Sequence, residues 1–194
     1  QELYEGVNLK GKGSIGLITY LRTDSTRISE EADANCREYI GQQYGEEFVG
    51  EEKSVKTTKT GKIQDAHEAI RPTDSSLSPA MIKEQLPRDL FRLYQLIWTR
   101  FVASRMAEAV YETTSVKIEA GEYHFNVAAS RVKFDGFMTV YSYDTEKSTM
   151  NAAMKKITKD TEITLSELKP QQHFTQPTAH FTEAYLVKTL EELG

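Results

Sequence analysis

Residues 16 to 25, GLITYLRTDS, place a tyrosine and an arginine where they could act together. A tyrosine hydroxyl has a pKa of about 10, so at neutral pH it is a weak nucleophile unless its proton is removed or a cation stabilises the anion. Residues i and i+2 of a strand share a face, which would put Tyr20 and Arg22 side by side. Arginine also binds phosphate oxygens through two parallel hydrogen bonds. The pair suits attack on a phosphodiester, but a purely structural strand could carry the same two residues.

Small hydroxyl side chains surround this pair. Thr19, Thr23 and Ser25 add donors that could hold the backbone of a nucleic acid strand. They share the segment with Asp24, a carboxylate that could orient a nearby cation. Residues 19 to 25 are therefore a candidate phosphodiester-binding segment.

A second candidate cluster is QDAHEAIRPTD, residues 64 to 74. His67 could donate to a phosphate oxygen or move a proton near neutral pH, and Arg71 adds a cation ahead of Pro72, which fixes the backbone. A histidine flanked by carboxylates is also a common hydrogen-bonded structural group. The lysines at positions 53, 56, 59 and 62 indicate a solvated loop more than a DNA track. The spacing of His, Cys and Asp residues predicts no metal site in this chain.

Two kinds of element must position these residues. Mixed β-branched and aromatic residues predict a strand over residues 15–23, and the polar turn after it leads to a helix capped by Ser29. The stripe of that helix is Ala32, Cys36, Ile40 and Tyr44, and Gly45 ends it. Pro79 and Pro87 open two further helices, each as a first helical residue. The second of these runs to about residue 109 on an apolar face of Leu90, Leu93, Ile97, Trp98, Phe101 and Val102.

Beyond residue 110 the hydrophobic period changes from helical to alternating. Residues 115–120 and 123–127 alternate across a turn at residues 120–122, which predicts a β-hairpin. Asp135 and Gly136 mark another turn before FMTVYSY, and EITLSEL at 162–168 indicates a further strand. FTEAYLVKTLEELG at the end predicts a helix with Leu186, Val187, Leu190 and Leu193 on one face.

These elements predict an α+β protein in which a mostly helical N-terminal domain bears the tyrosine strand and a smaller antiparallel β unit follows. We expect a helical lid-like domain at 1–108, a β arch segment at 109–175 and the start of a returning helix at 176–194. The first residue is not Met and the last follows a helix pattern, so we expect a piece of a longer polypeptide.

The net charge of −5 argues against a protein that coats nucleic acid electrostatically over its whole surface, and it favours a local binding site. No apolar run is long enough to predict a membrane span.

Four motifs in order, GLITYLRTDST, QDAHEAIRPTD, LYQLIWTRFVASRM and FTEAYLVKTLEELG, resemble those of the bacterial type IA DNA topoisomerases, and the AHEAIRPT form is similar to topoisomerase I rather than topoisomerase III. The resemblance implies Tyr20 as the nucleophile, Arg22 as its phosphate-stabilising neighbour and His67 as a supporting residue. It also implies that Asp24 orients His67 or Arg22.

The same resemblance implies a reaction for the whole enzyme. Tyr20 would cleave one DNA strand through a 5′-phosphotyrosine intermediate and relax negatively supercoiled DNA without ATP. The Mg²⁺ that the family uses would be held by an acidic Toprim domain, which has no counterpart in this chain, so its ligands would lie in the remaining domains of the same polypeptide. Single-stranded and negatively supercoiled DNA are the expected partners. The expected location is the bacterial cytoplasm, at the nucleoid, with no membrane partner.

Two other functions stay open from the residues. The chain could be a non-catalytic module that binds single-stranded DNA, with Tyr20 stacked on a base. It could also be an interaction or purely structural domain, which the negative charge would suit. Only the enzyme would attach DNA covalently to Tyr20, so that attachment distinguishes it from both alternatives.

Overall fold

A computed structural model describes residues 1–22, 25–51, 67–141, 157–159 and 161–193. Its elements in chain order are α1 (Glu2–Glu5), β1 (Val7–Leu9), β2 (Gly13–Ile15), α2 (Glu30–Tyr44), η1 (Glu46–Phe48), α3 (Pro79–Ile82), η2 (Lys83–Gln85), α4 (Arg88–Arg105), β3 (Val110–Ala120), β4 (Tyr123–Phe134), η3 (Gly136–Thr139) and α5 (Glu183–Leu193). Contacts group them into two units, residues 1–156 and 157–194. The chain has the α+β character expected, while the three predicted domain limits stay predictions. Among the described helices, none has the length and hydropathy to cross a membrane.

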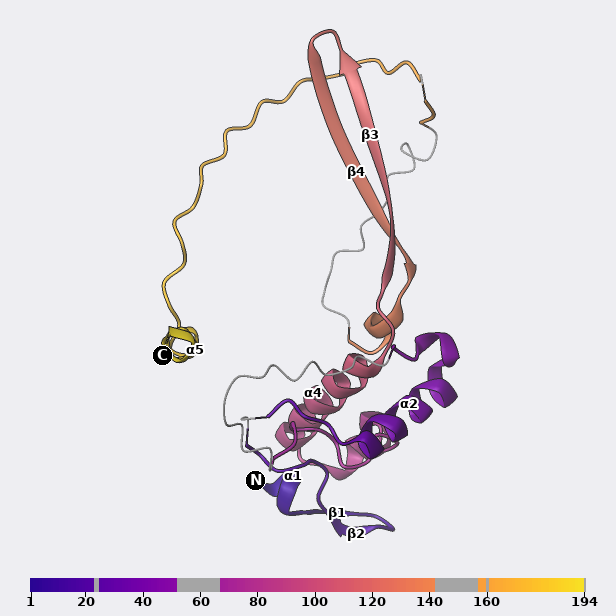
Figure 1. The fold of residues 1–194 in the computed structure, drawn as a ribbon, viewed down its shortest axis with the longest axis vertical. Helices are drawn as coiled ribbons and strands as arrows, with labels where there is room; N and C mark the ends of the chain where they lie inside the picture. The colour runs from indigo at the N-terminus through magenta and orange to yellow at the C-terminus, as the bar shows by residue number, and fades with distance from the viewer. Residues whose placement is uncertain (23–24, 52–66, 142–156, 160, 194) are drawn as a thin grey trace. The chain divides into compact units, whose positions relative to one another are not determined.

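Helix α2 forms as its sequence predicts. The Ser29 hydroxyl accepts a hydrogen bond from the Ala32 amide at 3.3 Å and so satisfies one free donor of the first turn. Cys36 and Ile40 are buried on the predicted stripe, and Gly45 follows the helix with a φ of 111°. The buried stripe faces α4, beside which α2 lies in Figure 1.

Helix α4 corrects three details of the prediction. Pro87 is the N-cap and not the first helical residue, and the helix ends at Arg105 because Met106 turns extended to bridge with Val49. Leu93 is 46% exposed, whereas Tyr94 is fully buried. Tyr94 lies four residues before Trp98 on the core face, and its hydroxyl donates to the Leu77 carbonyl at 2.7 Å, so its polar atom is satisfied inside the core.

An ion-pair network fastens α2 to the end of α4. Asp33 accepts from Arg37 at 2.6 Å and from Arg105 at 2.8 Å, and all three side chains are about four-fifths buried. Burial acts to raise the pKa of Asp33, but the hydrogen bonds and charges of the two arginines together outweigh it and lower that pKa. The ionised carboxylate is therefore the form that stabilises the fold.

This network predicts loss of stability in acid. Because the folded-state pKa of Asp33 is lowered, its contribution is complete above roughly pH 5 and is lost as the pH falls through the folded value. We expect Asp33→Asn to lower the free energy of unfolding by about 1–3 kcal/mol at neutral pH, since hydrogen bonds to charged groups contribute that much. Thermal melts from pH 7 to pH 3 should converge for the two proteins. A constant difference at every pH would contradict this role.

The β unit has a longer hairpin than the alternating residues predict, and among the described residues it lacks the further predicted strand. β3 and β4 form the expected antiparallel hairpin, with Gly121 at its turn at a φ of 63°. After the hairpin, Gly136–Thr139 form a 3-10 turn, η3. Residues 161–180 hold neither helix nor strand, so the strand predicted at 162–168 is wrong. A strand needs a hydrogen-bonded neighbour for its backbone groups, and none of the described strands pairs with those residues.

The base of the hairpin is attached to the helical core. The Phe134 ring lies 4.8 Å from that of Phe48, and the Phe137 amide donates to the Ala107 carbonyl at 2.9 Å. Gly136 has a φ of 50°, and a Cβ there would lie 2.5 Å from the Ala107 oxygen, so only glycine fits this close approach. Beyond this attachment, every side chain of β3 and β4 is exposed or half-buried. In the other unit, α5 confirms the predicted final helix, and its apolar side chains are exposed.

Candidate active site

Tyr20 follows a segment that is extended but is not the predicted strand. The strand β2 ends at Ile15, and beyond it only Ile18 pairs, in a single bridge with Pro72. The Thr19 amide donates to the Arg71 carbonyl at 2.9 Å, and the Thr73 amide donates to the Leu17 carbonyl at 3.0 Å. The Arg71 amide donates to the Thr19 hydroxyl and the Leu17 amide donates to the Leu3 carbonyl, so neither returns a second ladder bond at this bridge. Within residues 15–22 the predicted strand is therefore reduced to Ile15, the last residue of β2, and the bridge at Ile18.

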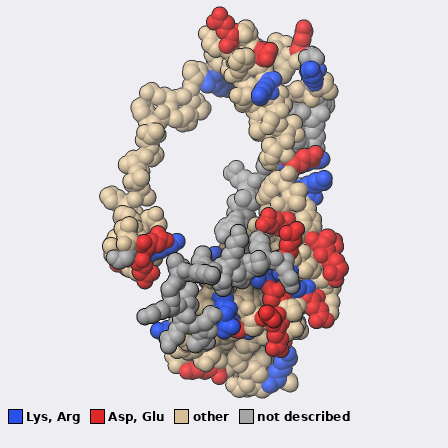
Figure 2. All heavy atoms as spheres, viewed as in Figure 1, with Lys and Arg blue, Asp and Glu red and all other residues tan. Residues whose placement is uncertain are grey.

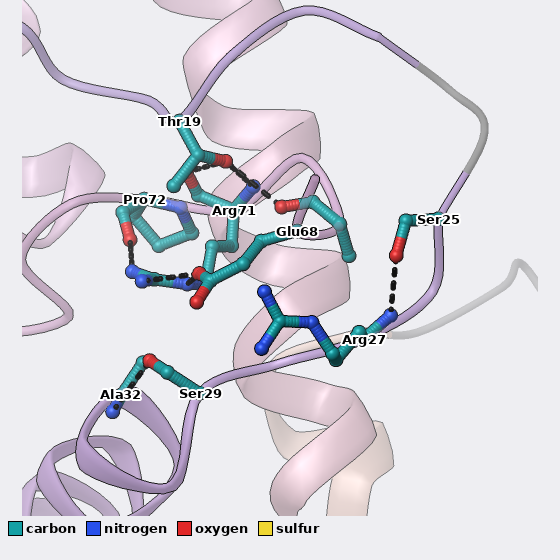
Figure 3. Close-up of polar contacts among 9 residues, drawn as sticks. Thr19, Ser25, Arg27, Ser29, Ala32, Glu68, Arg71 and Pro72 are labelled. Atoms are coloured by element: carbon teal, nitrogen blue, oxygen red, sulfur yellow. Dashed lines mark hydrogen bonds and ion pairs between the residues drawn. The ribbon is translucent and has the colours of Figure 1, made fainter. Parts of the chain in front are cut away.

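The Thr19 hydroxyl joins this segment to the second candidate cluster. It donates to the Ala69 carbonyl at 2.8 Å and accepts from the Arg71 amide at 2.9 Å (Figure 3). Ala69 in turn donates its amide to the Arg27 carbonyl at 2.8 Å. The Thr19 hydroxyl thus holds residues 69–71 against the segment that carries Tyr20. Its hydrogen bonds position other residues of the site.

The two predicted clusters meet at an aromatic contact. The ring centroid of Tyr20 lies 5.5 Å from that of His67, with the planes tilted by 31°. Tyr20 is 49% exposed, while Leu17 and Ile18 just before it are buried. The buried pair anchors the backbone, and the tyrosine ring extends from it to the surface beside the imidazole. A substrate can therefore reach the Tyr20 ring.

Arg71 lies beside this contact but is already paired. Its guanidinium donates to the Glu68 carboxylate at 2.7 and 3.0 Å and to the Pro72 carbonyl at 3.1 Å (Figure 3). The Arg71 side chain is 14% exposed. A DNA phosphate at Arg71 would share the guanidinium with a carboxylate, so its predicted role as a DNA contact stays a prediction.

The remaining predicted site residues follow Tyr20 at positions 22 to 25. Arg22 is exposed two residues after Tyr20, and its position on the same side as the Tyr20 hydroxyl stays a prediction. The Ser25 hydroxyl accepts from the Arg27 amide at 3.1 Å, which shapes the turn before α2 (Figure 3). Thr23 and Asp24 lie outside the described residues.

Sequence reasoning missed two neighbours of the site. Glu68 pairs with Arg71 at 2.7 Å in a segment that is not helical, so the i,i+3 spacing that favours ion pairs on a helix does not predict this pair. Tyr4 packs against Tyr20 in an edge-to-face contact, with ring centroids 5.4 Å apart and planes at 66°. No local signal predicts that contact, because it depends on how α1 packs against residues 16–18.

Other tyrosines differ from Tyr20 in burial. Burial raises the pKa of Tyr39 to about 12 and raises that of the buried Tyr94 further. A raised pKa makes the phenolate harder to form, and a buried hydroxyl cannot meet a polymer. These two tyrosines are therefore unsuited to be nucleophiles.

Charges on the surface limit where DNA could bind. Figure 2 shows acidic side chains gathered over α2 in the view drawn. The first turn of that helix carries Glu30, Glu31 and Asp33, and the turn η1 after it carries Glu46 and Glu47. Phosphates are repelled from such a surface, so contacts with DNA would have to be local.

Acidic, imidazole and thiol side chains do not gather into a metal site in the described part of the chain. Within that part, no group of three or more His, Cys, Asp or Glu side chains could hold a metal ion. The Mg²⁺ that the resemblance implies does not fit the described part of this chain.

Comparison with known proteins identifies the family of this chain. A family model described as DNA topoisomerase matches residues 1–194. The fold is similar to the structure of full-length topoisomerase I from Thermotoga maritima, with a TM-score of 0.68 and 36% sequence identity. The match covers 99% of this chain and 30% of that one, so the chain spans less than a third of the length of the protein it matches. The chain therefore belongs to the bacterial type IA DNA topoisomerase family.

Proposed function

We propose that this chain is the tyrosine-bearing part of a topoisomerase that relaxes negatively supercoiled DNA by transient cleavage of one strand. The observation that carries the proposal is the half-exposed Tyr20 beside His67, in a chain that belongs to this family. The two segments are held together by buried neighbours and by the Thr19 hydrogen bonds, so the pair is preorganised before DNA arrives.

The proposed reaction is a reversible exchange of phosphoesters. The Tyr20 Oη loses its proton and bonds to phosphorus, and the bond from phosphorus to the 3′ oxygen breaks. The 3′ oxygen takes up a proton and leaves as a hydroxyl, while the 5′ phosphate stays on Tyr20. After another strand has passed through the gap, the 3′ hydroxyl attacks the phosphotyrosine and restores the strand.

Three residues of the two motifs have proposed parts in this exchange. Arg22 binds the phosphate oxygens and stabilises the charge that develops on them. His67 supports the same phosphate from the opposite segment, and Asp24 orients Arg22 or His67. Because one phosphoester replaces another, no ATP is needed, and relief of negative supercoiling drives the cycle.

The proposal assigns the remaining steps to other domains. We propose that the Mg²⁺ and the group that protonates the 3′ oxygen belong to the Toprim domain of the same polypeptide. The substrate is then single-stranded DNA within a negatively supercoiled duplex. We further propose that the enzyme works at the nucleoid in the bacterial cytoplasm.

The chain alone is expected to bind single-stranded DNA weakly and to cleave none of it. Its affinity should rest on a few contacts around Arg22 and Arg71 and should fall as salt is added, because each phosphate contact releases counterions. Fluorescence anisotropy with a labelled oligonucleotide at several salt concentrations measures this. An affinity that does not change with salt would contradict phosphate contacts.

A denaturing gel tests the proposed function itself. The chain is incubated with end-labelled single-stranded oligonucleotide and Mg²⁺, with and without a separately produced Toprim-containing fragment. We expect a covalent protein–DNA adduct only in the mixture. Efficient cleavage by the chain alone would show that the catalytic groups have been assigned to the wrong domain. Binding without any adduct in the mixture would favour the non-catalytic DNA-binding module.

A further inference from the structure

Tyr4 lies at the candidate active site without a part in the proposed exchange of phosphoesters. Its ring and the Tyr20 ring meet in an edge-to-face contact at a centroid distance of 5.4 Å, and Tyr4 is 41% exposed. Tyr4, Tyr20 and His67 therefore form a continuous row of three rings, with the proposed nucleophile in the middle. Two of the three rings are open to solvent over about half of their area.

The backbone fixes Tyr4 relative to Tyr20. The carbonyl of its neighbour Leu3 accepts the Leu17 amide at 2.7 Å and the Ile18 amide at 3.3 Å, and the Leu3 side chain is buried. At Gly16 an added Cβ would lie 2.5 Å from the Tyr4 carbonyl oxygen. Glycine is thus required for α1 to pack this closely. The ring of Tyr4 is held to the same segment that carries the nucleophile.

The charges around Tyr4 select the part of a DNA strand that could meet it. The short helix α1 carries Glu2 and Glu5, both exposed, on either side of Tyr4. Phosphates are repelled by these carboxylates, whereas a neutral base is not. An exposed aromatic ring is a stacking surface for any base, because every base has a π face.

We propose that Tyr4 is a stacking subsite for the base of a nucleotide next to the phosphodiester that Tyr20 attacks. This inference rests on the proposed function, because it takes the scissile phosphate to lie at Tyr20. With the phosphate there, the adjoining sugar places its base within one nucleotide of the row of rings. Stacking on Tyr4 turns the strand so that the phosphate faces the Tyr20 hydroxyl while the other phosphates stay away from α1. The subsite is tolerant of sequence and acts on the position of the strand.

The test measures binding without cleavage. In a Tyr20→Phe background, with the Toprim-containing fragment present, single-stranded oligonucleotides are titrated by fluorescence anisotropy. Tyr4→Leu is expected to weaken binding by about 5- to 150-fold, the loss associated with one stacked base. Tyr4→Phe keeps the ring and should stay within about twofold. Tyr123→Leu, at the exposed turn of the hairpin, is the matched control and should bind like the parent.

An abasic scan separates stacking from packing within the protein. Each nucleotide of the oligonucleotide is replaced in turn by an abasic residue. One position next to the cleavage site should weaken binding to the parent protein and have no further effect in Tyr4→Leu. A 2-aminopurine at that position should be quenched by the parent and less by Tyr4→Leu. If Tyr4→Leu weakens binding equally for intact and abasic strands, or not at all, the subsite is wrong.

The two proposals fail in different ways. If the wild-type mixture forms no covalent adduct, the proposed function fails whatever the anisotropy shows. If the adduct forms and Tyr4→Leu binds as tightly as the parent, only the stacking subsite fails. Thermal melts of each variant show whether it is folded, and the scan in the parent protein needs no variant of Tyr4.

Discussion

Replacing Tyr20 by phenylalanine is expected to abolish the covalent DNA adduct altogether. The substitution removes one oxygen atom and leaves the ring in contact with Tyr4 and His67, so the packing of the site is kept. Without that oxygen no phosphotyrosine can form, and neither buried Tyr94 nor Tyr39, whose pKa values are raised, can replace it. Adduct on a denaturing gel and relaxation of supercoiled plasmid should both fall below detection.

The control for this experiment is Tyr123→Phe, which removes a hydroxyl from a residue that is 71% exposed at the hairpin turn. It should leave adduct formation unchanged. DNA binding by Tyr20→Phe should remain close to that of the parent, because the phosphate contacts are intact. An adduct that survives Tyr20→Phe would remove the nucleophile on which the proposed function depends.

The second large effect is expected at Arg22. Losing one donor that stabilises developing charge lowers a rate by about 10²–10³, so Arg22→Ala should slow cleavage by that factor in the reconstituted enzyme. Arg22→Lys keeps the charge but not the two parallel donors, so its cleavage rate should lie between those of the parent and Arg22→Ala. Single-turnover cleavage with saturating oligonucleotide measures the chemical step apart from binding.

Arg92→Ala supplies the matched loss of charge, because Arg92 is exposed on α4. It should leave the cleavage rate unchanged. His67→Ala should slow cleavage less than Arg22→Ala if His67 only supports the phosphate. The loss of rate should be larger if His67 carries a proton in the reaction. Normal cleavage rates in both Arg22→Ala and His67→Ala would show that the parts given to them are wrong.

What the sequence predicted well was determined by local chemistry. The cap at Ser29, the buried positions Cys36 and Ile40, and the β3–β4 turn each depend on a few neighbouring residues. The local sequence pattern was enough to predict these features, because each depends on residues close together in the chain. The proximity of His67 to Tyr20 was also predicted, because the motifs that carry them suggest the same phosphate chemistry.

The errors have a common physical origin in distant contacts. Leu93 and Tyr94 are adjacent on the helix, and the hydrogen bond of Tyr94 with Leu77 shows which of them enters the core. The strand predicted at 162–168 needed a partner that the described residues do not supply. The Tyr4 contact depends on the carbonyl of Leu3, which no period in the sequence marks.

The hydrogen bonds of Thr19 also bear on the order of folding. They connect positions that are 50 and 52 residues apart in the chain. Such contacts form only after a long loop has closed, which costs entropy and slows their formation relative to a local helix such as α2. We therefore expect the nucleophile to remain unplaced during synthesis until residue 71 has left the ribosome. A nascent chain that stops earlier would carry a tyrosine with no imidazole beside it and no fixed direction.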